Sequence, residues 1–387
     1  MGQQVLGGRE QVRAAVVQAS PVFMNKKGCL EKACDLILKA GKERAEIVVF
    51  PETWIPTYPY WGMGWDTAAA AFADVHADLQ DNSLVVGSKD TDILGKAARD
   101  AGAYVVMGCN ELDDRIGSRT LFNSLVYIGK DGRVMGRHRK LIPSYIERIW
   151  WGRGDARDLK VFDTEIGRIG GQICWENHIV NITAWFIAQG VDIHVAVWPG
   201  LWNCGAAQGE SFIYAGHDIN KCDLIPATRE RAFTGQCFVL SANNILRMDE
   251  IPDDFPFKNK MTYAGPGQGE FVGWACGGSH IVAPTSEYIV PPTFDEETIL
   301  YADLNAKYIK VVKSVFDSLG HYTRWDLVSL TRQPQPYEPL AGERPMAMPE
   351  ERIEQVADAV AREFNLDVEK VDKIVRQVTT HNRQRAA

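Results

Sequence analysis

The first half of the chain alternates short apolar runs with stretches of helical periodicity. Residues 12–18 and 47–50 are apolar runs of strand length, and apolar residues recur at helical spacing over 30–38 between them. A second helical pattern over 93–101 leads into a third apolar run at 103–108. Strands that alternate with helices in this way predict an α/β layered domain.

In the middle of the chain, neighbouring strands are instead joined by tight turns. Residues 124–128 and 133–137 flank Gly129-Lys130-Asp131-Gly132, whose Asp-Gly pair is a strong hairpin signal. Residues 161–164 and 168–173 flank a second tight turn. Antiparallel hairpins beside βα units predict mixed sheets and exclude a Rossmann fold. The remaining elements that we expect are helices at 180–189 and 227–234 and strands at 193–197, 238–241, 280–283 and 299–302.

The pattern also predicts how the chain divides into segments. We expect an N-terminal tail over 1–11, one large domain over 12–332, a proline-rich linker over 333–349 and an amphipathic helical tail over 350–387. The tail either docks on the main body or contacts a neighbouring subunit. Within the domain, residues 247–278 are rich in Gly, Pro and Asp, which predicts a long surface loop or insertion.

Composition excludes several classes of partner and cofactor. The net charge of −8 argues against nucleic acid or an anionic membrane as the main partner. The eight cysteines are scattered without a C-x-x-C pair, so neither a disulfide scaffold nor a metal site is expected. No signal peptide or membrane-spanning stretch is visible, and we expect a cytoplasmic protein that needs no cofactor.

Three segments each place a reactive side chain just after a strand. They are Phe-Pro-Glu-Thr-Trp with Glu52, His-Arg-Lys-Leu-Ile-Pro with Lys140, and Gly-Gly-Gln-Ile-Cys-Trp-Glu-Asn with Cys174. Alone, Glu52 and Lys140 are typical of solvated strand ends, and a cysteine such as Cys174 is more often a small core residue. Together they form a chemically coherent set.

A thiol is nucleophilic only as the thiolate, and a nearby cation or helix N-terminus lowers its pKa. Lys140 supplies a cation, and Glu52 is a base that takes the thiol proton and later passes it to a leaving nitrogen. The glycines before Cys174 are expected to permit a sharp turn from strand to helix, as in a nucleophile elbow. His178, four residues after Cys174, is an alternative base.

The three motifs in this order resemble the Glu-Lys-Cys triad of the nitrilase superfamily of carbon–nitrogen hydrolases, over residues 12 to 330. Cys-Trp-Glu after the strand resembles the nitrilase branch in particular. The resemblance implies a second glutamate that orients the site, which by motif match is Glu147. It also implies a four-layer α-β-β-α sandwich with mixed sheets, and a homo-oligomer built from dimers that sometimes extends into a spiral or filament.

The resemblance further implies that an organic nitrile is hydrolysed to its acid and ammonia. An aromatic surrounding suits an apolar nitrile, so we expect Trp54, Trp151, Trp175 and Pro199 to line or support the pocket. Alternatives with the same triad are an amidase, a carbamoylase or a cyanide-degrading enzyme. A non-catalytic interaction module is a further alternative, against which the intact triad argues.

Overall fold

The chain divides into two compact units, residues 1–335 and 336–387. In this computed structural model the described residues are 4–64, 70–201, 222–261 and 270–331 of the first unit. In the second unit they are 357–358, 360–361, 364 and 366–373, so the expected linker lies outside the described residues. Among the described residues of this unit, Ala357, Ala361 and Val371 are buried together, whereas Phe364 and Val368 are exposed.

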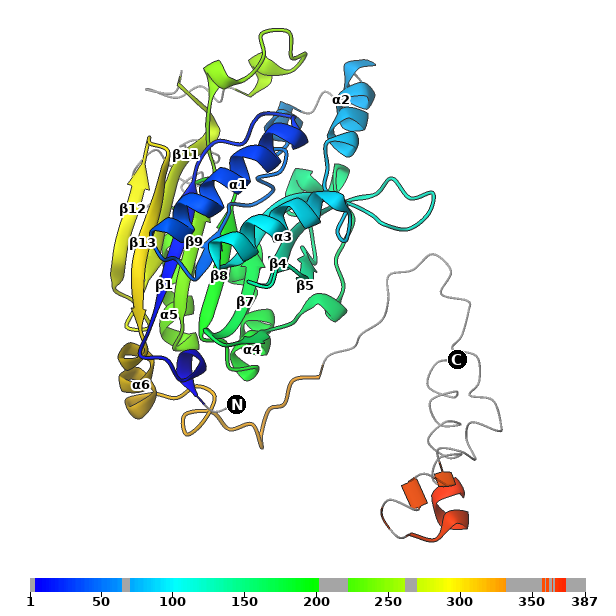
Figure 1. Ribbon diagram of the computed structural model, residues 1–387, viewed down its shortest axis with the longest axis vertical. Coiled ribbons are helices and arrows are strands. Elements are labelled where there is room, and N and C mark those ends of the chain that lie inside the picture. Colours follow the sequence, from blue (N-terminus) through cyan, green and yellow to red (C-terminus); the bar gives the residue numbers. More distant parts are fainter. Residues whose placement is uncertain are drawn as a thin grey trace. The chain divides into compact units, whose positions relative to one another are not determined.

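Two sheets form the centre of the first unit (Figure 1). The first has the order β13-β1-β2-β3-β4-β5, with parallel pairing only between β1 and β2 and between β2 and β3. Its strands are β1 (Gln11–Gln18), β2 (Ile47–Val49), β3 (Tyr104–Leu112), β4 (Leu121–Ile128), β5 (Val134–Arg139) and β13 (Thr298–Asn305).

The second sheet has the order β10-β11-β9-β8-β7-β6, and β12 pairs with β11. Only β7 with β8 and β8 with β9 are parallel. Its strands are β6 (Phe162–Thr164), β7 (Gly167–Ile173), β8 (Ile193–Trp198), β9 (Phe238–Asn243), β10 (Ile245–Arg247), β11 (Phe271–Val282) and β12 (Tyr288–Phe294). Both sheets are therefore mixed, as the hairpins of the sequence predict.

Helices cover the outer face of each sheet. On the first sheet, α1 (Lys26–Lys42) and α3 (Lys89–Ala101) bury their apolar stripes in one cluster with the outward side chains of β1 to β4. On the second sheet, α4 (Val180–Ala188) and α5 (Leu224–Gly235) form the other outer layer. The described part of the first unit also contains α2 (Ala70–Asp81) and α6 (Ala306–Val315). The expected α-β-β-α sandwich is confirmed.

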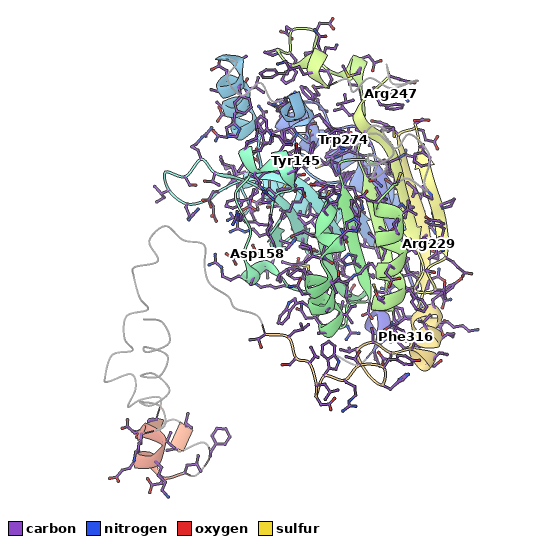
Figure 2. All side chains as sticks on the ribbon, turned by 180° about the vertical axis from the view of Figure 1, so that it is seen from behind. Tyr145, Asp158, Arg229, Arg247, Trp274 and Phe316 are labelled. Atoms are coloured by element: carbon purple, nitrogen blue, oxygen red, sulfur yellow. The ribbon has the colours of Figure 1, made fainter. Side chains whose placement is uncertain are left out.

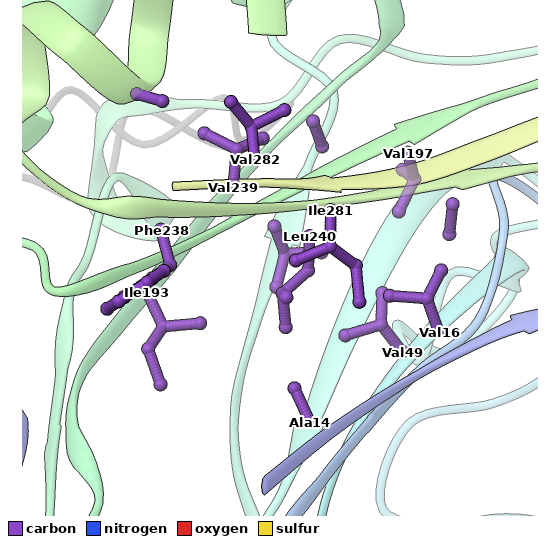
Figure 3. Packing of buried hydrophobic residues seen from close by; sticks show 14 of the residues in the cluster. Ala14, Val16, Val49, Ile193, Val197, Phe238, Val239, Leu240, Ile281 and Val282 are labelled. Atoms are coloured by element: carbon purple, nitrogen blue, oxygen red, sulfur yellow. The ribbon is translucent and has the colours of Figure 1, made fainter. Parts of the chain in front are cut away.

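The largest apolar cluster fills the space between the two sheets and continues to α5 on the outer face of the second sheet (Figure 3). Val16 and Val49 of the first sheet face Leu240 and Ile281 of the second. Period-2 alternation explains this arrangement, because one side of each strand faces the partner sheet and the other faces a helix layer. Each fully buried aliphatic side chain stabilises the fold by about 1.5–3 kcal/mol, which makes this layer a rigid support for groups at the strand ends.

One expected boundary is wrong. The segment 247–278 is not a continuous surface loop, because β11 already begins at Phe271. Residues 271–278 therefore belong to the sheet, and Gly277 and Gly278 have positive φ angles within the strand. The glycines that favour a loop in the sequence allow this strand to run close to Gln18 and Leu201, which a Cβ atom would meet at 2.6 and 2.9 Å.

The described residues contain no helix long and apolar enough to cross a membrane.

Candidate functional site

The three reactive residues of the motifs all follow strands of the central sheets. Glu52 comes three residues after β2, Lys140 comes directly after β5, and Cys174 comes directly after β7. All three side chains are buried, although each can ionise. Buried ionisable groups at strand ends are expected at a functional site and not in a structural core.

Lys140 lies between two carboxylates. Its Nζ is 3.0 Å from Oε1 of Glu52 and 2.7 Å from Oε2 of Glu147. The hydroxyl of Tyr58 donates to Oε1 of Glu147 at 2.9 Å, and the backbone N–H of Ser144 donates to Oε2 at 2.6 Å. Burial alone would lower the pKa of Lys140, but the charges of Glu147 and Glu52 raise it, so the ammonium persists at all working pH values.

Glu52 is held at only one of its two carboxylate oxygens. Its Oε1 accepts hydrogen bonds from Lys140 and from the side-chain amide of Asn123, at 3.0 and 2.6 Å. Among the described residues, its buried Oε2 has no hydrogen-bond partner. Burial, partly offset by Lys140, raises the pKa of Glu52 to about 7. A carboxyl group with this pKa can both accept and return a proton near neutral pH.

Cys174 begins a 3-10 turn, η5 (Cys174–His178), and is itself the sharp bend after β7. Its φ is +51°, a region that non-glycine residues enter at a cost of roughly 1–2 kcal/mol. Burial raises the pKa of the thiol well above its usual value, although Lys140 opposes this effect. The resting thiol is therefore protonated, and the cation of Lys140 alone does not activate it. A base is required.

The expected role of the glycines before Cys174 is wrong. Gly170 and Gly171 lie inside β7 and neither has a positive φ angle. Instead they allow close packing, since a Cβ on Gly171 would lie 2.8 Å from the hydroxyl oxygen of Tyr127 and 2.9 Å from the carbonyl oxygen of Val195. Strain at the bend is carried by the nucleophile itself, as is common at functional sites.

Two further residues with positive φ adjoin the other catalytic candidates. Thr53, with φ of +45°, follows Glu52, and Tyr145, with φ of +44°, lies two residues before Glu147. Unfavourable backbone conformations persist only where the surroundings hold them in place, and they concentrate where geometry serves function. Each acidic residue of the site therefore lies in or beside a strained loop.

Glu176 links the segment that carries Lys140 to the turn that carries Cys174. Its Oε1 accepts the backbone N–H of Leu141 at 2.8 Å, and its Oε2 accepts the backbone N–H of Ile173 at 2.9 Å. His138 Nε2 lies 2.8 Å from the same Oε2. Burial opposes the ionised forms of this pair, but their mutual attraction lowers the pKa of Glu176 and raises that of His138. His138 thus pairs with Glu176 and not with the cysteine.

The four residues expected around the pocket occupy different positions. Trp54 is in the helix-side cluster, where its Nε1 donates to the carbonyl of Ala19 at 2.7 Å, so it supports the Glu52 loop from behind. Trp151 packs on the ring of Tyr58 with centroids 5.6 Å apart. Trp175 is half-buried and donates from Nε1 to Asp223 at 2.6 Å.

The fourth of these residues, Pro199, is linked to an aromatic cluster that the sequence did not single out. Its carbonyl accepts the hydroxyl of Tyr60 at 2.7 Å, and Tyr60 packs on Trp274 with centroids 5.5 Å apart. Tyr58 also contacts both Tyr60 and Trp274. Figure 2 shows Trp274 well away from Phe316, toward the opposite end of the main unit. These aromatic rings border the catalytic carboxylates through Tyr58.

His178, the alternative base, is on the outer side of the turn. Its side chain is 38% exposed, and its Nε2 lies 3.4 Å from Asp223. Among the hydrogen bonds between described residues, none joins His178 to Lys140 or Glu52. Within the same part of the chain, no group of three or more His, Cys, Asp or Glu side chains is arranged to hold a metal ion.

Comparisons with known proteins agree with this geometry. Residues 13–314 match the carbon–nitrogen hydrolase family. A nitrilase of Penicillium rubens is 34% identical over 336 residues, which cover 85% of this chain and 95% of the relative. A bifunctional nitrilase/nitrile hydratase of Lupinus angustifolius is 32% identical over 332 residues, which cover 85% of this chain and 88% of the relative.

The fold is likewise found among solved structures. Nit3 of Saccharomyces cerevisiae, described as a member of branch 10 of the nitrilase superfamily, superposes with a TM-score of 0.60 at 18% identity, covering 81% of this chain and 96% of that one. The family assignment rests on the family match over most of the chain and on the nitrilase relatives at 32% and 34% identity. The chain belongs to the carbon–nitrogen hydrolase family, within the nitrilase superfamily.

Proposed function

We propose that the protein hydrolyses an organic nitrile to its carboxylic acid and ammonia, with Cys174 as nucleophile. The observation that carries the proposal is the buried Glu52–Lys140–Glu147 set beside a cysteine held in a strained turn. The nitrilases among the relatives support the nitrile as substrate class.

The first half of the reaction forms the carbon–sulfur bond. Glu52 takes the thiol proton as Sγ of Cys174 adds to the nitrile carbon, and the negative charge develops on the nitrile nitrogen. Lys140 and the backbone N–H of Trp175 stabilise that charge, and proton return to the nitrogen gives a thioimidate. The pKa of Glu52, about 7, suits a group that gives back the proton it has taken.

The second half consumes two waters. Glu52 activates the first water, which adds to the thioimidate carbon, and the tetrahedral intermediate loses ammonia to leave a thioester. A second water then cleaves the thioester, so one nitrile and two waters give one acid and one ammonia. Since the sulfur divides the addition into smaller steps, the scheme uses only side chains of this chain.

The test is ammonia and acid release from aliphatic, aromatic and arylacetonitriles and from cyanide, with the matching amides alongside. We expect nitrile turnover in the wild type and loss of turnover in Cys174→Ala with the fold intact. Turnover of amides alone would move the activity to the amidase side. Substantial nitrile hydrolysis by Cys174→Ala would refute Cys174 as the nucleophile.

A second product is possible from the same intermediate. If the tetrahedral intermediate expels the thiol in place of ammonia, the amide is released. The bifunctional nitrilase/nitrile hydratase among the relatives favours measuring this branch. Quantifying acid and amide in the same reaction gives the ratio directly.

The homo-oligomer that the family resemblance implies remains a proposal. Light scattering coupled to size exclusion tests it, because a single chain has a mass of 43.2 kDa. A species of that mass at all working concentrations would contradict assembly.

A further inference from the structure

Behind the nucleophile lies a set of buried polar side chains that the proposed reaction does not use. Asn177 belongs to η5, His194 to β8 and Arg231 to α5. Their exposed fractions are 7%, 0% and 2%. Polar groups buried this deeply destabilise the fold unless they are hydrogen-bonded, so their hydrogen-bond partners indicate what they do.

The three side chains form one continuous chain of hydrogen bonds. Arg231 Nη2 lies 3.3 Å from Nδ1 of His194, and His194 Nε2 lies 2.8 Å from Oδ1 of Asn177. The amide of Asn177 then donates from Nδ2 to the carbonyl of Cys174 at 2.9 Å and to that of Gln172 at 3.3 Å. This chain of hydrogen bonds from Arg231 through His194 and Asn177, called the relay below, therefore ends on the backbone of the nucleophile.

Donor chemistry fixes the direction of every bond in the relay. A guanidinium only donates, so Nδ1 of His194 is an acceptor and the ring proton lies on Nε2. That proton is donated to Oδ1 of Asn177, which leaves the amide nitrogen of Asn177 facing the carbonyl of Cys174. All three bonds therefore point from the arginine toward the nucleophile, and aligned bonds polarise one another.

The relay begins at a charge and continues through a neutral ring. Burial lowers the pKa of Arg231 to about 10, so the guanidinium remains charged at neutral pH. Among the described residues no carboxylate forms an ion pair with it, and its other recorded bond is donated from Nη1 to the carbonyl of Thr183 at 2.8 Å. Burial and the charge of Arg231 lower the pKa of His194 well below its usual value. His194 therefore transmits polarisation without carrying charge.

The carbonyl that receives this relay belongs to the Cys174–Trp175 peptide, whose N–H is the backbone donor in the proposed reaction. Withdrawing electron density from the oxygen of a peptide makes its N–H a stronger donor. We propose that Asn177, His194 and Arg231 are positioning residues that polarise this peptide, so that it stabilises the anion formed when the thiolate adds to the substrate. This inference rests on the proposed function, since it requires an anionic intermediate beside Trp175.

A purely structural role for the relay predicts a different outcome. Asn177 would then only hold Cys174 in its positive-φ bend, and its loss would displace the sulfur. A displaced sulfur reacts poorly with any electrophile. Loss of polarisation weakens only those reactions that place negative charge near the peptide N–H.

Iodoacetamide separates the two roles. The Sγ of Cys174 attacks the CH₂ carbon of iodoacetamide, the carbon–iodine bond breaks, iodide leaves, and the thiol proton passes to Glu52. No anion forms at the peptide N–H in this reaction. We expect Asn177→Leu, which keeps the shape and removes the donor, to lower kcat on a nitrile about ten-fold. KM and the alkylation rate of Cys174 should each stay within about two-fold of wild type.

A matched control comes from another buried hydrogen bond on α5. Thr228 Oγ1 lies 2.9 Å from Nε2 of the buried His280, and among the described residues this pair makes no hydrogen bond to Cys174. Thr228→Val should lower Tm but should not reproduce the loss of kcat that is expected for Asn177→Leu. Equal losses of kcat in Thr228→Val and Asn177→Leu would overturn the proposal, because both would then report general destabilisation.

The far end of the relay gives a second test if Asn177→Leu fails to fold. Arg231→Met removes the charge and should lower kcat several-fold, whereas Arg231→Lys should recover much of the loss. Unchanged kcat in Arg231→Met, or parallel loss of turnover and alkylation in either relay variant, would overturn the inference. Wild-type protein without nitrile turnover would instead refute the proposed function, so the two failures are distinguishable.

Discussion

Replacing Glu52 with glutamine should inactivate the protein and at the same time stabilise its fold above neutral pH. Glutamine keeps the size of the side chain and resembles the protonated acid at every pH. Burial raises the pKa of Glu52 from 4.5 to about 7, which means that the folded protein disfavours the ionised form. Lys140 retains Glu147 as a partner at 2.7 Å, so the variant leaves no unpaired buried cation.

The magnitude follows from the pKa difference between the two states. A shift from 4.5 to about 7 corresponds to about 3 kcal/mol at roughly 1.4 kcal/mol per unit. Between these pH values the folded state binds more protons than the unfolded state, so this contribution to stability is fully present below pH 4.5. It is lost as the pH rises toward 7. The variant has no such group, and its advantage over wild type should therefore grow through this window and level off above it.

Urea unfolding of wild type and Glu52→Gln from pH 4 to pH 9 measures the difference. We expect nearly equal free energies of unfolding at the acid end and a variant that is about 3 kcal/mol more stable at pH 8. Glu31→Gln, at an exposed position on α1, should show no such pH dependence. A constant difference between Glu52→Gln and wild type, or a variant that is less stable at pH 8, would refute the reasoning.

Three further predictions concern the site and its support. Lys140→Ala should lower kcat/KM by about a hundred-fold or more, because a preorganised cation stabilises an anionic transition state by several kcal/mol. As a control, Lys130→Ala, at an exposed position, should leave steady-state kinetics unchanged. Glu147→Gln should shift the acid limb of the pH–rate profile to lower pH, because the charge of Glu147 raises the pKa of Glu52; a shift to higher pH would contradict this. Gly171→Ala should destabilise the fold by about 1–3 kcal/mol in urea unfolding, because its Cβ would clash with the neighbouring strands, and an unchanged midpoint would contradict the close packing.

The strands and helices that the sequence predicts are those with a clear apolar period. The runs at 12–18 and 193–197 correspond to β1 and β8 within one residue at each end, since both strands are buried on both faces. By contrast, α6 was not predicted, because its apolar period can be recognised only when its boundaries are known. The strand β12 was also not predicted, because its two prolines argue against a strand. Edge strands tolerate proline, because one side of the backbone needs no sheet partner.

The site could be predicted only as far as its motifs reach. Glu52, Lys140, Glu147 and Cys174 carry recognisable surroundings, and the structure brings the first three into direct contact. Asn123, which binds Glu52, had one usable signal, because it is a polar residue in the middle of the entirely buried strand β4. His194 had the same signal, because it is a polar residue in the entirely buried strand β8, whereas Tyr58 had none. Their roles depend on pairings between residues far apart in sequence, which local pattern cannot specify.

The charges of the site explain why it can be so deeply buried. With Glu52 ionised, the resting set of two carboxylates, one ammonium and one neutral thiol has a net charge of −1. Transfer of the thiol proton to Glu52 only moves this charge to sulfur, and attack on the nitrile moves it on to nitrogen, near Lys140. The sum does not change during the addition. The free energy of folding therefore already includes the desolvation of one buried negative charge. Each step of the addition only redistributes this charge among groups that are already in place.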